Sequence, residues 1–145
     1  MSYVPSSRRL TRWTTWTIGV LAVYQIGLGL YFIAVRPPLL PEDLEFMALS
    51  APPASLMRWL DLVFTVLGGQ MIAVGLLLAP LISPRIRAAA NRQAYTAFAM
   101  AGATSVGLMS AVNFMLSSEF RWLLLAPVAL WAISITLAWI ARPED

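Results

Sequence analysis

Several amide and carboxylate side chains occur inside stretches of sequence that are otherwise strongly apolar. Gln70 lies in LGGQMIAVGL, residues 67–76, Gln25 lies near the middle of an earlier apolar stretch, and Asn113 lies in a later one. Asp61 is the only acidic residue placed where it could enter the same environment. Amides in hydrocarbon need hydrogen-bonding partners, and ionisable groups there are costly and often functional. These four side chains are the first candidates for a site.

Asp61 has two interpretations. It lies close to the interfacial residue Trp59, and Arg58, three residues earlier, can pair with it on the same helix face. This spacing favours a structural charge at the membrane interface, and the alternative is a group that handles protons or cations. Glu119 with Arg121 is interpreted in the same way, as charge beside the membrane surface.

Most other chemistry is excluded by composition. The 145 residues contain no cysteine and no histidine, which removes disulfides, thiolate chemistry, the usual zinc sites and histidine ligation of haem or pigments. We therefore expect no catalytic residue, no metal and no cofactor. A lipid-modifying enzyme would have to use a few charged side chains on one side of the membrane, and it ranks third among the hypotheses: Arg58, Asp61, Glu119 and Arg121.

The composition is that of a membrane protein. Hydrophobic residues make up 59% of the chain and charged residues 12%, whereas soluble proteins average about 45–50% and about 25%. The ten basic residues are all arginine, and the net charge of +3 is too small and too dispersed for a nucleic-acid-binding surface. The expected partner is the lipid bilayer, with no nucleic acid.

Four apolar segments are long enough to cross a hydrocarbon core of about 30 Å, which takes about 20 helical residues. Because every backbone polar group must be satisfied inside lipid, we expect helices. The predicted fold is all-α, a transmembrane four-helix bundle with antiparallel up-down topology in a single domain covering residues 1–145. Its spans are predicted near Trp13–Val35, Trp59–Ile82, Tyr95–Leu116 and Trp122–Ala141.

The arginines indicate the orientation. Seven of the ten precede the first span, join the second to the third, or follow the fourth: Arg8, Arg9, Arg12, Arg85, Arg87, Arg92 and Arg142. The other side carries Arg36, Arg58 and Arg121 together with four acidic residues. By the positive-inside rule, both termini are expected in the cytoplasm.

The longest connection has its own order. In RPPLLPEDLEFMALSAPPAS, residues 36–55, Pro41 suits the first position of a helix, and the acidic residues after it favour the positive end of the helix dipole. Leu44, Met47 and Ala48 then share one face. We expect a short amphipathic helix over about residues 41–50 that lies on the outer surface and ends near Ala51, before two prolines.

Small and polar residues define helix faces that could pack together. Gln25 and Gly29 share a face of the first span; Asp61, Gly68 and Gly75 share one on the second, with Gly69 beside them. Gln70 points about 140–160° away from those glycines. One side of the second span therefore permits close backbone approach, and the other needs a hydrogen-bonding partner, for which Gln25 is a candidate. We expect a lateral contact with a second chain or a lipid. The alternatives are a wide bundle that covers both faces itself, or a Gln70 side chain that bonds its own backbone.

The third and fourth spans contribute further candidates. A stripe on the third span is predicted to be a helix interface, and Asn113 is its most polar member: Thr96, Ala99, Ala103, Gly107, Ser110, Asn113 and Ser117. On the fourth span, Pro127 is expected to produce a kink. Trp131, one turn later, either fills a gap in the bundle or contacts lipid or a flat ligand such as a quinone, carotenoid or pigment tail.

The stretches RPPLLPEDLEFMALS and WLDLVFTVLGGQMIAVGLL resemble sequences of small four-span bacterial membrane proteins, broadly DoxX-like, over about residues 13–80. The resemblance implies a four-helix membrane bundle and specifies no functional residue. The absence of cysteine argues against a thiol-linked redox role.

We therefore expect a non-catalytic integral membrane protein of a bacterial inner membrane, serving as an accessory or scaffolding subunit of a larger complex. Its partners would be other membrane subunits or further copies of itself. The alternative is a small transporter or channel subunit that acts as an oligomer, with a thin polar path formed by Asp61, Thr65, Gln25, Gln70 and Asn113.

Overall fold

A computed structural model describes residues 6–48 and 50–141, with side chains for residues 9–48, 50–119 and 121–141. Every regular element in this part of the chain is helical, which confirms the all-α prediction. Arg142 lies outside the described residues. The elements in chain order are α1 (Ser6–Ala34), α2 (Pro41–Phe46), α3 (Ala54–Leu78), η1 (Ala79–Ile82), α4 (Pro84–Ala89), α5 (Arg92–Gly102), η2 (Ala103–Gly107), α6 (Leu108–Met115), η3 (Glu119–Arg121) and α7 (Leu125–Ile140).

Three helical segments are long and apolar enough to cross a membrane. They are Arg9–Ala34 in α1, Ala54–Ile82 in α3 with η1, and Arg92–Met115 in α5, η2 and α6. The fourth predicted span is represented by α7, which is apolar but has only 16 residues. At 1.5 Å per residue α7 is about 24 Å long, against about 30 Å of hydrocarbon.

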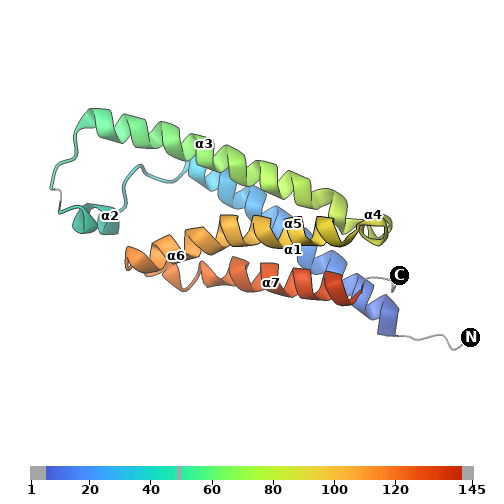
Figure 1. Ribbon diagram of the computed structural model, residues 1–145. Helices are drawn as coiled ribbons and strands as arrows, with labels where there is room; N and C mark the ends of the chain where they lie inside the picture. Colours follow the sequence, from blue (N-terminus) through green and yellow to red (C-terminus); the bar gives the residue numbers. More distant parts are fainter. Residues whose placement is uncertain (1–5, 49, 142–145) are drawn as a thin grey trace, which may run out of the picture.

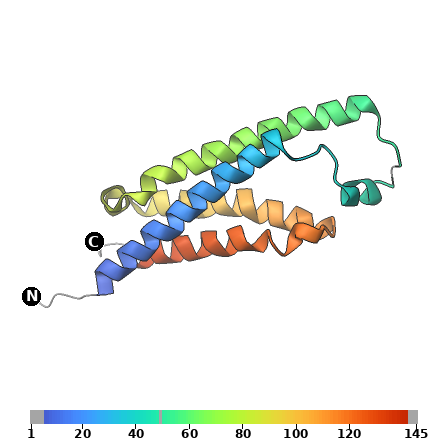
Figure 2. The same ribbon diagram turned by 180° about the vertical axis from the view of Figure 1, so that it is seen from behind.

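The long helices form two antiparallel pairs, α1 with α3 and the α5–α6 segment with α7, and α1 also packs against α7 (Figures 1 and 2). In the first pair the Thr15 hydroxyl donates to the Ile82 carbonyl over 3.4 Å, and Gly29 faces Gly68 at the other end. In the second pair α5 packs on α7, with the rings of Phe98 and Trp131 5.1 Å apart. We call the two ends of the molecule the α2 end and the α4 end.

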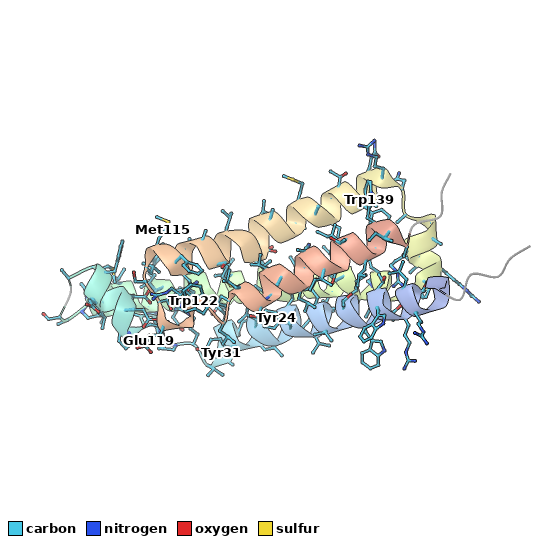
Figure 3. The ribbon with its side chains drawn as sticks, turned by 90° about the horizontal axis from the view of Figure 1, so that it is seen from below. Tyr24, Tyr31, Met115, Glu119, Trp122 and Trp139 are labelled. Atoms are coloured by element: carbon cyan, nitrogen blue, oxygen red, sulfur yellow. The ribbon has the colours of Figure 1, made fainter. Side chains whose placement is uncertain are left out.

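The densest packing lies away from the α2 end. A cluster of buried residues joins α1, α3, α5, η2 and α7: Leu21, Ala22, Leu78, Phe98, Val106 and Trp131. Tyr31, Glu119 and Trp122 lie toward the α2 end, whereas Trp139 lies at the α4 end (Figure 3). Exposed tryptophans lie at both ends, Trp13 near the α4 end and Trp59 near the α2 end, where membrane proteins commonly carry them.

A short helix exists where the sequence predicts one, but it is shorter than expected. Pro41 occupies the first turn of α2, and the Asp43 carboxylate accepts a hydrogen bond of 2.9 Å from the Leu40 N–H, the one side-chain half of a capping box that is possible with leucine at the N-cap. The helix ends at Phe46 rather than near Ala51. Ala48 has a φ of 51°, and a residue in this left-handed region ends a helix without any need for the prolines that follow.

The fourth helix also begins later than predicted, at Leu125 rather than Trp122. Residues 116–124 form turns and the short helix η3, and Ser117 has a φ of 54°. Pro127 therefore lies in the first turn of α7. Backbone N–H groups in the first turn have no carbonyl acceptor within the helix, so the missing N–H of proline breaks no helical hydrogen bond. The expected kink at Pro127 is wrong for this reason.

Arg87 holds the α4 end together, a role that the positive-inside interpretation did not include. Its buried guanidinium donates to the carbonyls of Leu81 and Ile82 over 2.5 and 2.8 Å, and to the Thr15 hydroxyl over 2.8 Å. The Tyr95 hydroxyl donates to the Arg87 carbonyl over 3.1 Å. Burial lowers the pKa of Arg87, and the phenol of Tyr95 opposes that shift. Arg87 thus satisfies the carbonyls that end the second span.

Candidate functional site

A large apolar cavity lies between α3 and the α5–α6 segment, with α1 behind it and α2 at one end. Its volume is about 800 Å³. One wall is a continuous apolar face of α3: Leu56, Leu60, Phe64, Leu67, Met71 and Val74. The opposite wall comes from η2, α6 and the residue after it: Val106, Leu108, Met109, Val112 and Leu116. The helices that form the two walls are held together mainly through α1 and α7, and this leaves space between them.

Gln25 lines this cavity from α1. Only 1% of its surface is exposed, and its Nε2 is the only buried side-chain nitrogen or oxygen among the described residues without a hydrogen-bond partner. An unsatisfied buried donor costs about 1–3 kcal/mol. A buried amide in this state is a strong indication that a hydrogen-bond acceptor belongs in the cavity.

The structure brings three of the predicted polar residues to one place. Gln25, Gln70 and Asn113 all line the cavity. The Asn113 Nδ2 donates to the carbonyl of Met109 over 2.8 Å, so this amide partly satisfies itself. Gln70 is exposed, no hydrogen bond joins it to Gln25 in either direction, and the Gln25 Nε2 is unpaired.

Asp61 and Thr65 do not join this group. Both are exposed on α3 and absent from the cavity wall, and the Thr65 hydroxyl donates to the Asp61 carbonyl. The expected pairing of Asp61 with Arg58 is wrong, because the ion pair seen among the described residues joins Arg36 to Asp43 instead. The five residues of the predicted polar path therefore do not line one continuous surface.

Arg36 fixes the α2 end of the cavity, and the sequence interpretation did not identify it. Its guanidinium lies 3.8 Å from the ring centroid of Phe64, contacts Asp43 at 3.4 Å and donates to the Pro37 carbonyl over 2.9 Å. Burial lowers the pKa of Arg36, and the negative charge of Asp43 opposes that shift. The sequence did carry a sign of this ion pair, because Arg36 lies seven residues before Asp43, an acidic residue at the predicted start of a helix.

A second contact ties α2 to the end of α6. The Ser118 hydroxyl donates to the Glu42 carboxylate over 2.9 Å, and Ser118 is only 1% exposed. Phe46 and Met47, at the end of α2 and just beyond it, also line the cavity. The short helix therefore closes one end of the space between α3 and α6, rather than only lying on a membrane surface.

The predicted glycine interface lies between α1 and α3. A Cβ atom added at Gly29 would lie 2.5 Å from the Gly68 carbonyl oxygen, and one added at Gly75 would lie 2.9 Å from the Ala22 carbonyl oxygen. Gly69 has no atom within 4 Å of such a Cβ and is exposed. The glycines thus face inward, and Gln70 and Gly69 are left on other sides of α3.

The predicted small-residue stripe matches the buried face of the third span only in part. Ser110 is buried, but Thr96, Ala103 and Ser117 are exposed. Four other buried residues of this segment lie off the stripe: Tyr95, Phe98, Gly102 and Val106. The aromatic residues face α7, and residues 103–107, which include Gly107, form a π-helical turn that alters the register of the faces. Thr104, Ser105 and Val106 of this turn line the cavity. π-helical turns inside α-helices are frequent at functional sites.

Trp131 belongs to the core of this chain. It is 2% exposed, its indole N–H donates to the Phe98 carbonyl over 3.0 Å, and its ring occupies the space left by Gly102. The interpretation of Trp131 as a contact for lipid or a flat ligand is therefore wrong, and the gap-filling alternative is the one that the packing supports. The position of Trp131 near the middle of an apolar segment did not indicate that Gly102 would lie opposite its ring.

Comparison with known proteins adds no assignment, because no family model, curated protein or solved structure matches the chain. The resemblance to DoxX-like proteins stays a prediction from the two quoted stretches. Among the residues that the structure describes, no group of three or more acidic side chains could hold a metal ion. Two features remain for a function to explain, the apolar cavity with its unpaired amide and the exposed side of α3 at Gly69 and Gln70.

Proposed function

We propose that this chain is a non-catalytic accessory subunit of a larger membrane assembly in a bacterial inner membrane. In this proposal α7, extended by the turns of residues 119–124, completes a fourth crossing. Both termini then lie in the cytoplasm, α4 lies on the cytoplasmic side and α2 lies on the outer side. The excess of arginine at the α4 end supports this orientation.

The side of α3 turned away from α1 and from the cavity carries the proposal. Thr65, Gly69 and Ala73 follow one another at four-residue intervals, and all three are exposed. A Cβ at Gly69 would meet nothing within 4 Å, so a groove is open there. Small residues at this interval allow two transmembrane helices to approach closely.

Gln70 supports a partner at the same place. It is exposed at the edge between this small-residue face and the cavity, near the middle of α3. An amide exposed to hydrocarbon gains a hydrogen bond when a second helix packs beside it, and this is worth about 1–2 kcal/mol in model peptides. We name the exposed residues Thr65, Gly69, Gln70 and Ala73 the α3 contact face.

The experiment compares Gly69 with Gly27, two exposed glycines that have open space where a Cβ would be placed. A tagged chain is extracted in mild detergent as the wild type, as Gly69→Leu and as Gly27→Leu, and its complexes are sized and identified by native mass spectrometry. Gly27 is also exposed with nothing near its Cβ position, but it lies on α1, outside the contact face. We expect a stoichiometric second chain, of the same or another sequence, in the wild type and in Gly27→Leu.

The leucine at position 69 should remove that second chain, because it fills the groove that the partner helix occupies. A chain that is monomeric in all three preparations would overturn the proposal. Equal retention of the partner by Gly69→Leu and Gly27→Leu would place the contact elsewhere, and would also contradict it.

A further inference from the structure

The cavity offers a second, independent inference, because the side chain at its deep end lacks a partner. Gln25 is almost fully buried, lines the cavity, and has an Nε2 donor that no described acceptor reaches. We infer that the cavity binds a neutral, elongated lipid whose leading end carries a carbonyl oxygen, and that the Gln25 Nε2 donates a hydrogen bond to that oxygen.

The residues around Gln25 explain why the acceptor must come from outside. The hydroxyls of Thr104 and Ser105 also line the cavity and donate to the carbonyls of Met100 and Ala101, and the Asn113 amide donates to its own helix. Their oxygens could still accept a hydrogen bond, but none of them lies within hydrogen-bonding reach of the Gln25 Nε2. A buried water needs about two to four polar partners, and the walls here are mainly aliphatic and aromatic.

The shape of the cavity fits a long apolar molecule. Its volume of about 800 Å³ lies within the range of about 300–1,000 Å³ usual for ligand sites. The lining residues on α3 run from Leu56 to Val74, which is about 27 Å along a helix axis. Such a space accepts a chain laid along α3 better than a compact solute.

The cavity can be reached from the side. Several of its lining residues are exposed, including Leu67 at 40%, Leu108 at 59% and Val112 at 49%. These residues stand on α3 and α6, which form opposite walls of the cavity, and Figure 1 shows α2 at the same end of the molecule. A molecule dissolved in the bilayer can therefore enter between α3 and α6 without passing through water.

The charged residues at the α2 end argue for a neutral ligand. Arg36 is engaged by Asp43 and by the Pro37 and Pro38 carbonyls, and Glu42 is engaged by Ser118. These pairings leave no uncommitted cation at the cavity wall to hold a phosphate group. A carbonyl oxygen offered to Gln25 is the polar feature that the site selects.

Carbonyl-bearing neutral lipids include acyl glycerol esters and prenylated quinones, and the experiment separates them. The full-length chain is placed in nanodiscs and titrated with dioleoylglycerol, with a short-tailed prenylated quinone, and with a hydrocarbon of matched length without oxygen. We expect one of the two carbonyl probes to bind at least tenfold more tightly than the hydrocarbon, because the lost hydrogen bond leaves the Gln25 donor unpaired.

Two variants locate the site. Gln25→Met keeps the size of the side chain but removes the donor, and it should weaken the carbonyl probe about tenfold without weakening the hydrocarbon. Met71→Trp fills the cavity and should remove binding of every probe. Gln93→Met is the matched control, since Gln93 is an exposed amide outside the cavity, and it should bind as the wild type does.

Equal binding of carbonyl and hydrocarbon probes, equal affinities for Gln25→Met and Gln93→Met, or no binding of either carbonyl probe to the folded wild type would each overturn the inference. Unfolding of Gln25→Met is not expected, because it removes an unsatisfied buried donor. None of these outcomes depends on the α3 contact face, so failure here is distinct from failure of the proposed subunit role.

Discussion

Gly29 and Gly68 face each other so closely that neither can carry a side chain. A Cβ on either one would lie 2.5 Å from the carbonyl oxygen of the other. Because backbone atoms cannot give way as a flexible side chain can, Gly68→Ala should force α1 and α3 apart. We expect a destabilisation of about 1–3 kcal/mol, measured as a lower midpoint of thermal unfolding in detergent.

Gly27→Ala is the control for this change. Gly27 lies on the same helix as Gly29, is exposed, and has open space where a Cβ would be placed. Alanine there should leave stability unchanged or raise it, since alanine favours a helix by up to about 1 kcal/mol over glycine. Equal losses at positions 27 and 68 would contradict the close α1–α3 contact.

Arg87→Met should destabilise the protein far more than Arg85→Met. Both changes remove one positive charge from the same segment, but Arg85 is exposed and Arg87 is buried against the carbonyls of Leu81 and Ile82. Each hydrogen bond to a charged group is worth about 1.5–3 kcal/mol. The comparison is made by thermal unfolding, and matching midpoints for the two variants would refute the carbonyl-binding role.

Gly102→Ala should disturb the packing between α5 and α7. A Cβ at Gly102 would overlap the indole of Trp131, whereas a Cβ at Gly107 would lie at an ordinary 3.6 Å from its nearest neighbour. We expect a loss of about 1–3 kcal/mol for Gly102→Ala and little change for Gly107→Ala. Combining Gly102→Ala with Trp131→Phe should restore part of the loss, because a smaller ring makes room.

The long helices were predictable because their sequences are long and apolar. The helix ends were predicted correctly only where the residue types themselves favour a helix end. Pro41 and the acidic residues after it placed the start of α2 correctly. Its end was missed because Ala48 has a left-handed backbone, which no property of alanine signals. The start of α7 was missed because Trp122 is apolar whether it lies in a helix or in a turn.

The polar residues that line the cavity could be predicted from the sequence, but the existence of the cavity could not. Gln25, Gln70 and Asn113 were recognised as polar groups in apolar surroundings, but a helix period cannot say which helices leave space between them. That space follows from the close glycine contact between α1 and α3 and from the packing of Trp131 against Gly102, both of which are tertiary. The π-helical turn at residues 103–107 also breaks the uniform period on which the predicted stripe depended.

Ser118→Ala should loosen α2 from the end of α6. The change removes the 2.9 Å hydrogen bond to Glu42, one of the few polar contacts between α2 and the rest of the chain. Hydrogen exchange of the α2 backbone amides should become about tenfold faster, as expected from a loss of about 1.4 kcal/mol. Glu45→Gln, which alters an exposed carboxylate on the same helix, should leave exchange unchanged. Unaltered exchange in Ser118→Ala would show that this contact does not hold α2 in place.

The proposed orientation can be tested because the natural chain has no cysteine. Ser50 follows α2, Gln93 lies in the first turn of α5, and both are exposed, so a cysteine at either position should be reactive without damaging the fold. In intact cells with the outer membrane made permeable, Ser50→Cys should react with a membrane-impermeant maleimide. Gln93→Cys should react only after the inner membrane is opened, because the arginines near it favour the cytoplasmic side. The reverse pattern would place α2 in the cytoplasm, and labelling of both cysteines in intact cells would rule out a membrane between them.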